Sequence, residues 1–238
     1  MINSQKQKEV LQYLIDRKIP ADLALEIRDH MLSQLETELD KDLDFYFAFD
    51  QVKRSWKYDL HHVYPVLSWK TVARIHLHSV RKISNDLAKK SICYFLPIFI
   101  VLLFLTYFNP HLTKNMYWGL FLTIVGVSSY LYLRNFKLIN SAGTHFKTNI
   151  SIYQRGVSLF PVSAMYVLIF NLFNYSGRFE KYSLSWSNII DKNEFTVKNL
   201  SYIVLENTFI WTWILGILFL KQYKNAFEQV NKQLKIKL

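Results

Sequence analysis

The residues best suited to chemistry lie close together in the segment 25–39, LEIRDHMLSQLETEL. Glu26, Asp29 and His30 fall within one and a half helical turns, and positions 26 and 30 are neighbours on one helix face. Carboxylate and imidazole groups at this spacing can bind a metal ion or move a proton. A durable metal site needs three or four protein ligands, and no second histidine follows at helical spacing. We therefore interpret these residues as a packing or interaction motif, and expect no metal, cofactor or catalysis.

A second group of polar residues lies inside long apolar segments. Glu206 falls in the first turns of the segment 201–220, five or six residues from its outer end, and Asn171 and Asn174 close the preceding segment on that side. An ionisable residue within a membrane helix is costly and is a functional candidate by default. The favoured interpretation is hydrogen bonding between helices. A polar pocket for a ligand or ion, or simple exposure at the interface, are the alternatives.

Four segments are long and apolar enough to cross a bilayer, which takes about 20 apolar residues for roughly 30 Å of hydrocarbon. Unpaired backbone amides are not tolerated in lipid, so we predict that all four are helices. They cover residues 91–108, 116–133, 156–175 and 201–220.

The basic residues predict how these segments are oriented. The chain carries a formal charge of +11, and its Lys and Arg side chains are scattered beside apolar runs, which indicates membrane orientation rather than nucleic-acid binding. Fifteen of them lie in 70–90, 134–155 and 221–238, against five in the intervening loops. We predict that both termini are cytosolic. Heavy use of Asn, Lys, Ile, Tyr and Phe indicates an AT-rich bacterial genome, and so the bacterial inner membrane.

The first 65 residues have the periodicity of short amphipathic helices. Apolar residues recur every four positions from Leu23 to Leu39 after a turn at Pro20, and Asp44 can cap a further helix whose Phe45, Ala48, Phe49, Val52 and Trp56 share a face. We predict a small three-helix cytosolic domain over 1–65. A basic amphipathic helix is expected over 66–90, which either lies on an anionic leaflet or merely sets orientation. Its basic residues are Lys70, Arg74, Arg81, Lys82, Lys89 and Lys90.

The stretches IRDHMLSQLETEL and AFDQVKRSW, within residues 5–58, resemble the HAAS domain, a small helical prefix of many bacterial membrane proteins. The resemblance rests on the pair Asp29–His30 in one helix and the pair Ala48–Phe49 in the next. The segment DKDLD departs from the family, which has a Gly-containing turn there. The resemblance implies a regulatory or interaction domain, often encoded beside PadR-type transcription regulators, with no known chemistry to transfer.

Taken together, the sequence predicts an all-α chain: a cytosolic helical domain, a basic juxtamembrane helix, a four-helix transmembrane bundle over 91–220, and a basic cytosolic tail over 221–238. The expected function is regulatory and non-enzymatic, with a protein partner on the cytosolic side and self-association as a further option. A small transporter using Glu206 is the alternative, and a membrane enzyme acting on lipids is a weaker one. The expected partner-binding surface comprises Glu26, Asp29, His30, Phe45, Phe47 and Phe49.

Overall fold

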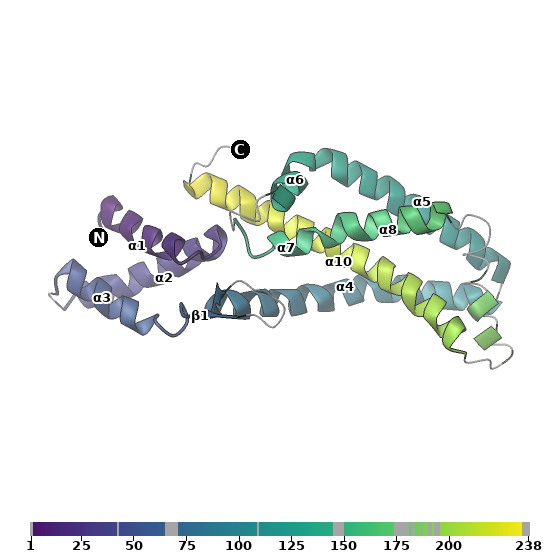
Figure 1. The fold of residues 1–238 in the computed structure, drawn as a ribbon, viewed down its shortest axis with the longest axis horizontal. Coiled ribbons are helices and arrows are strands. Elements are labelled where there is room, and N and C mark those ends of the chain that lie inside the picture. Colours follow the sequence, from purple (N-terminus) through teal and green to yellow (C-terminus); the bar gives the residue numbers. More distant parts are fainter. Residues whose placement is uncertain are drawn as a thin grey trace. The chain divides into compact units, whose positions relative to one another are not determined.

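The computed structural model shows an almost entirely helical chain (Figure 1). This confirms the predicted all-α class. The structure describes residues 2–41, 43–64, 71–108, 110–144, 150–173, 181, 184–186, 188–189, 192 and 196–234.

Three short helices form the N-terminal part of the chain, and their starts follow the expected local signals. They are α1 (Ser4–Asp16), α2 (Ala21–Leu39) and α3 (Phe45–Ser55). The Asn3 side chain accepts a hydrogen bond from the Gln5 N–H at 2.9 Å, and the Asp44 carboxylate accepts one from the Tyr46 N–H at 3.0 Å. Both caps satisfy a backbone donor that the first helical turn leaves unpaired. The prediction that Asp44 caps the third helix is confirmed.

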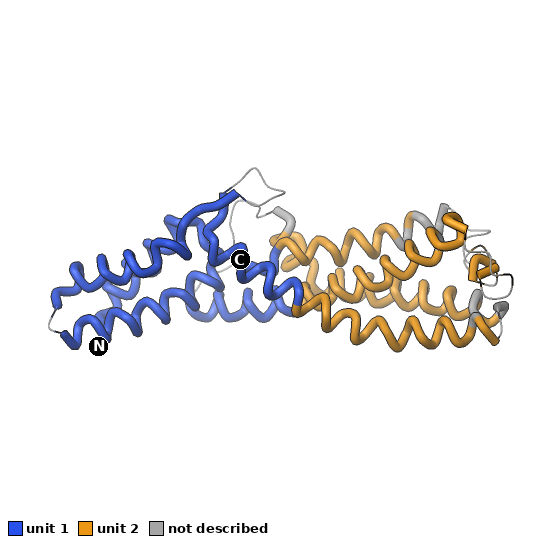
Figure 2. Tube along the Cα trace, turned by 90° about the horizontal axis from the view of Figure 1, so that it is seen from below, with its two compact units in different colours: residues 1–85, 144–154, 222–238 blue, residues 86–143, 155–221 orange. Residues whose placement is uncertain are grey.

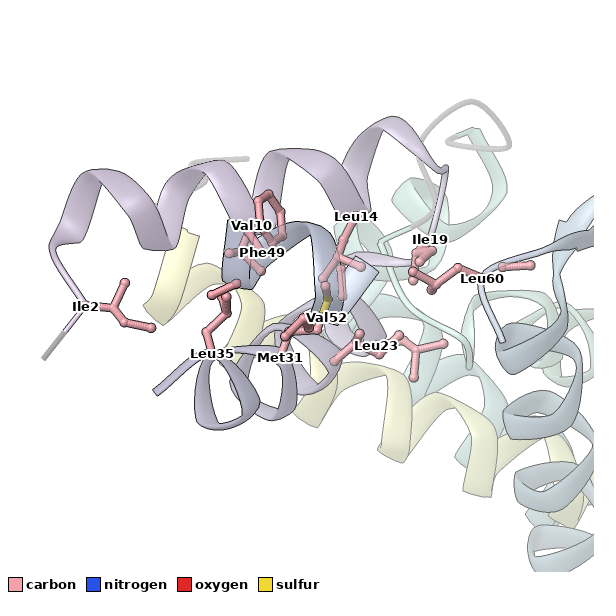
Figure 3. Packing of buried hydrophobic residues seen from close by; sticks show 14 of the residues in the cluster. Ile2, Val10, Leu14, Ile19, Leu23, Met31, Leu35, Phe49, Val52 and Leu60 are labelled. Atoms are coloured by element: carbon pink, nitrogen blue, oxygen red, sulfur yellow. The ribbon is translucent and has the colours of Figure 1, made fainter. Parts of the chain in front are cut away.

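The three helices share one apolar core (Figure 3). Leu23, Ile27, Met31 and Leu35, four residues apart along α2, are all buried. Burying each such side chain contributes about 1.5–3 kcal/mol. Leu39, at the end of the same stripe, is only partly buried. The periodicity therefore predicted which face of α2 packs, and the core extends from α1 through α3 to Leu60 and Ala73.

A short β-hairpin follows α3. Strand β1 (His62–Val63) pairs antiparallel with β2 (Val72–Ala73), with His62 opposite Ala73. The sequence predicted that a helix begins at residue 66, and this boundary was wrong, because β2 precedes the helix, which starts at Arg74. The Arg74 N–H donates to the His61 carbonyl and the Ile75 N–H to the Asp59 carbonyl, both at 2.9 Å. These bonds attach the start of the helix to the N-terminal domain.

The remaining helices are long and apolar or short connectors. They are α4 (Arg74–Phe108), α5 (Pro110–Arg134), α6 (Phe136–Thr144), α7 (Gln154–Val157), α8 (Leu159–Phe173) and α10 (Val197–Leu234). The predicted juxtamembrane helix and first span are thus one continuous helix. The predicted last span is likewise the middle of α10, which continues into the expected tail as far as Leu234.

The chain divides into two compact units, coloured separately in Figure 2. The first, unit 1, combines residues 1–85, 144–154 and 222–238, and the second, unit 2, combines 86–143 and 155–221. The chain therefore leaves unit 1 twice and returns to it twice.

Three helices of the described chain, α4, α5 and α10, are long and apolar enough to cross a membrane. In their most apolar stretches only 17%, 22% and 44% of residues are buried within the chain. Large apolar side chains such as Leu96, Ile100 and Phe104 are instead exposed. An exposed apolar surface this extensive is typical of contact with lipid. The described part of the fourth predicted span, α8, has 15 residues.

Candidate functional site: the Asp22 junction

The Asp22 carboxylate joins α2 to the segment 150–154, which lies 129 residues further along the chain. It accepts a hydrogen bond from the Ser151 hydroxyl at 2.6 Å and from the Ile152 N–H at 3.2 Å. The Asp22 N–H in turn donates to the Ile150 carbonyl at 3.2 Å. We call this group of contacts the Asp22 junction. It lies wholly within unit 1.

Local sequence explains why each partner is available. Asp22 lies in the first turn of α2, two residues after Pro20, where an acidic side chain is favoured by the helix dipole. On the other side, the Ser151 hydroxyl accepts from the Tyr153 N–H at 3.1 Å, and the Gln154 side chain accepts from the Ile150 N–H at 3.2 Å. These internal bonds hold the segment in a turn that presents its Ser151 hydroxyl and Ile152 amide to the carboxylate.

The junction is largely shielded from water, and this burial shifts the pKa of two of its ionisable groups. Burial raises the pKa of Asp22 above its ordinary value, although the hydrogen bonds from Ser151, Leu23 and Ile152 act in the opposite direction. Burial, followed by the negative charges of Asp22 and Glu26, raises the pKa of the Tyr153 phenol. The junction therefore holds a carboxylate in a position where its charged form is disfavoured.

Apolar packing reinforces the polar contacts. Ile152 is partly buried and packs against the same core that joins α1, α2 and α3. Ser151 is itself buried. The segment thus docks on the N-terminal domain through both a side chain in the core and hydrogen bonds at its edge.

Some of the residues predicted to form the partner-binding surface are buried in the structure and others are exposed. Phe45 and Phe49 are 2% and 8% exposed and belong to the core, so their assignment to the surface was wrong. Phe47 is 55% exposed on the same helix. A helix of this length must bury one face, and Phe45 and Phe49, four residues apart, lie on that face while Phe47 does not.

Glu26, Asp29 and His30, the three residues of α2 assigned to the partner-binding surface, are all exposed. Asp29 forms an ion pair with the neighbouring Arg28 at 2.7 Å, and a pair so open to water adds little stability. Glu26 lies near the Asp22 junction, where its charge acts on Tyr153. Of the two interpretations of these residues, the packing motif is not supported for Asp29 and His30, because both side chains are exposed.

The predicted basic residues lie on α4 except for Lys70, which falls outside the described residues. The Arg74 guanidinium lies 3.8 Å from the centre of the Tyr58 ring, a cation–π contact within unit 1. The others are exposed, namely Arg81, Lys82, Lys89 and Lys90.

Within α10, which is long and apolar enough to span a membrane, Glu206 is only 7% exposed. It lies nine residues after the start of α10, about 14 Å along the axis at 1.5 Å per residue. Its neighbour Asn207 is also buried, and its amide donates to the Ile203 carbonyl at 2.8 Å. The predicted companions cannot be compared, because the Asn171 side chain and Asn174 lie outside the described residues.

Two tryptophans of α10 link the long apolar helices through polar contacts. The Trp211 indole N–H donates to the Ser91 hydroxyl, and the Trp213 indole N–H donates to the Ser128 hydroxyl, both at 2.8 Å. Such bonds satisfy polar groups that lipid could not. They fix the axial position of α10 against α4 and α5.

Asp22 and Ser151 were not among the predicted site residues. The only local signal was an acidic residue in the first turn of a helix, which usually reports helix capping alone. Its partner lies beyond two apolar segments, and no short-range pattern connects them.

No known protein family, curated protein or solved structure matches this chain. Across the residues that the structure describes, no cluster of His, Cys, Asp and Glu side chains could hold a metal ion.

Proposed function

We propose that this chain is a multi-pass membrane protein whose N-terminal helical domain is a cytosolic regulatory module that binds another protein. The observation that carries the proposal is the Asp22 junction, because it links this domain to a segment that leads directly into α7 and α8. The proposal includes the HAAS-like character of residues 5–58 and a bacterial inner-membrane location.

Unit 1 is made up of three stretches of the chain: the N-terminal domain, the segment 144–154 and the C-terminal residues. Their association in one unit supports placing all three on the same side of the membrane. These three stretches gather into one unit although residues 86–143 and 155–221 separate them. If each excursion crosses the bilayer and returns, it must contain an even number of spans. Four spans, with α8 as the third, satisfy this condition. They also match the predicted positive-inside orientation.

The contacts at both edges of the domain support coupling. On one edge, the backbone bonds of Arg74 and Ile75 hold the start of α4. On the other, Asp22 holds the segment before α8. A partner that shifts the domain would change the constraint on two membrane helices at once. The domain is thereby able to report partner binding to the membrane part.

The exposed residues Phe47 and His30 are the positions from which we expect partner contact. Aromatic side chains are enriched at protein interfaces, and Phe47 and its neighbour Tyr46 are both exposed.

A photo-crosslinking amino acid at position 47 of the full chain, expressed in living cells, tests the proposal. We expect a defined protein adduct at position 47, identified by mass spectrometry, and none at Gln12, which is an exposed position on α1. An adduct with a second copy of the chain would assign the surface to self-association. Lipid adducts alone, or equal adducts at positions 47 and 12, would refute a partner-binding domain.

A small transporter remains the second candidate, because Glu206 is buried within a helix long enough to span a membrane. A buried ionisable side chain in such a helix is costly unless it serves a function or a specific contact. If Glu206 carries protons or ions, Glu206→Gln should abolish flux in proteoliposomes while leaving the melting temperature unchanged. Unchanged flux in that variant would remove this candidate.

A further inference from the structure

Exposed basic side chains lie within about ten residues, along the chain, of the four points where it passes between unit 1 and unit 2. They come from α4, α5, α6, α7 and α10, and all six are exposed. We call this set the basic collar: Lys89, Lys90, Arg134, Lys137, Arg155 and Lys221.

Contacts within unit 2 place most of the collar at one level. Within unit 2, α5 and α10 run in the same direction (Figure 1), and Trp213 is bonded to Ser128. Arg134 and Phe219 each lie six residues beyond that contact, so they are level with each other. Gly156 packs directly on the Phe219 ring, where an added Cβ would fall 2.2 Å from a ring carbon.

Because Arg155 adjoins Gly156 and Lys221 lies two residues after Phe219, both belong to the level of Arg134. Lys137 lies in α6, three residues after Arg134. With Arg134, Arg155 and Lys221 it makes up the first tier of the collar.

Lys89 and Lys90 form a second tier nearer the centre of the unit. The Trp211 bond to Ser91 places these two lysines level with the middle of α10, not with its Lys221 end. From Phe108 back to Lys90 the helix rises about 27 Å, whereas from Pro110 to Arg134 it rises about 36 Å. A hydrocarbon layer is roughly 30 Å thick, within a bilayer of about 40–45 Å including the headgroups. The two tiers therefore bracket the depth of one headgroup layer.

Tyrosines beside the collar agree with that depth. The Arg134 guanidinium donates to the Tyr130 hydroxyl at 2.9 Å, one turn toward the centre of α5. Tyr94, one turn beyond Lys90, is exposed. Amphipathic aromatic rings concentrate at the boundary between hydrocarbon and headgroups.

Charge identifies the ligand. Asp86 is the only acidic residue in 86–143, and in 155–221 the acidic residues other than Glu206 fall in the stretch 180–194 of the sequence. Within residues 86–143 and 155–221, basic residues thus outnumber acidic ones along the segments that carry the collar. Lipid phosphates at the same depth are the matching anions.

We propose that the basic collar binds the headgroups of anionic phospholipids in the leaflet that surrounds the Arg134 end of α5. This proposal does not depend on whether the N-terminal domain binds a protein partner. The bound chemistry is a phosphate group, and the assigned source is the lipid.

The test uses the purified full chain reconstituted in bilayers of phosphatidylcholine and phosphatidylglycerol in equal amounts. Lipids retained by the protein on extraction are counted by native mass spectrometry. The collar variant is Lys137→Gln/Arg155→Gln/Lys221→Gln. The matched control is Lys181→Gln/Lys192→Gln/Lys198→Gln, three exposed positions toward the far end of unit 2.

We expect the wild type to retain phosphatidylglycerol preferentially. In the collar variant, the ratio of retained phosphatidylglycerol to retained phosphatidylcholine should fall at least about fivefold, the effect expected of a single basic residue near the surface. The control should keep the ratio of the wild type. Equal preference in the collar variant and the control would overturn the proposal. Displacement of the lipid by millimolar inorganic phosphate would assign the site to a soluble phosphate and would also overturn it.

If the collar variant fails to fold, the wild type still decides the matter. Retention of phosphatidylglycerol should then fall steeply as salt is raised. Salt-independent retention would contradict an electrostatic collar.

Discussion

Replacing Asp22 by alanine removes the acceptor that holds the segment 150–154. The Ser151 hydroxyl and the Ile152 amide then lose their partner in a largely buried setting. Each buried donor left without an acceptor costs about 1–3 kcal/mol. Relief of a desolvated carboxylate offsets part of this cost. We expect a net loss of about 1–3 kcal/mol in the free energy of docking of the segment on α2.

Hydrogen exchange of the Ile152 amide in the full-length protein measures this loss directly. Since about 1.4 kcal/mol corresponds to a tenfold change in an equilibrium, exchange should accelerate about 5- to 150-fold in Asp22→Ala. Asp29→Ala is the matched control, because it removes an exposed carboxylate from the same helix. Equal exchange at Ile152 in wild type and Asp22→Ala would refute the view that the carboxylate holds the segment.

Further predictions concern pH, helix packing and the domain core. Because the pKa of Asp22 is raised in the folded protein, the folded state binds a proton more readily than the unfolded state does. The melting temperature of the wild type should therefore fall relative to that of Asp22→Asn as pH rises from about 4. Parallel pH profiles of the two melting temperatures would contradict this. Gly216→Ala should lower the free energy of unfolding in detergent by about 1–3 kcal/mol, because a Cβ there would lie 2.5 Å from the backbone of α8. Gly126 has open space around it, so Gly126→Ala should leave the thermal stability unchanged. Phe49→Ala should destabilise the N-terminal domain by about 3–5 kcal/mol, and Phe47→Ala by less than about 0.5 kcal/mol, as measured by limited proteolysis. Equal sensitivity of these two variants would mean that the buried face of α3 is wrongly assigned.

Local patterns predicted much of the N-terminal domain. The four-residue spacing from Leu23 to Leu35 identified the buried face of α2, because a helix repeats every 3.6 residues. Asp44 caps α3 as expected. The same periodicity should have excluded Phe45 and Phe49 from the surface, since both share the face of Ala48 and Val52 that packs inward.

Features that depend on distant contacts were not predictable in this way. Strands of two residues, such as β1 and β2, carry no periodic signal. The pairing of Asp22 with Ser151 joins residues 129 positions apart, and both have ordinary local roles, in a helix start and in a turn. The burial of Glu206 likewise depends on neighbouring helices, which composition alone does not place.

The same limit applies to the long apolar helices. Runs of apolar residues predicted where α4, α5 and α10 are apolar enough to span, because length and composition are local properties. The actual helix ends differ, since α4 continues back to Arg74 and α10 on to Leu234. Helices do not stop at the edge of the apolar run when polar residues with good helix propensity follow.

Disulfide trapping between positions 22 and 151 in native membranes tests the central claim most directly. The variant Asp22→Cys/Ser151→Cys, in a Cys93→Ser background, is oxidised and digested, and linked peptides are measured by mass spectrometry. The account predicts efficient linkage, because the two side chains are in hydrogen-bonding contact. It predicts little linkage in Asp29→Cys/Ser151→Cys, where the first cysteine is exposed two turns along α2. Linkage no greater at position 22 than at position 29 would show that the domain is not joined to the segment before α8.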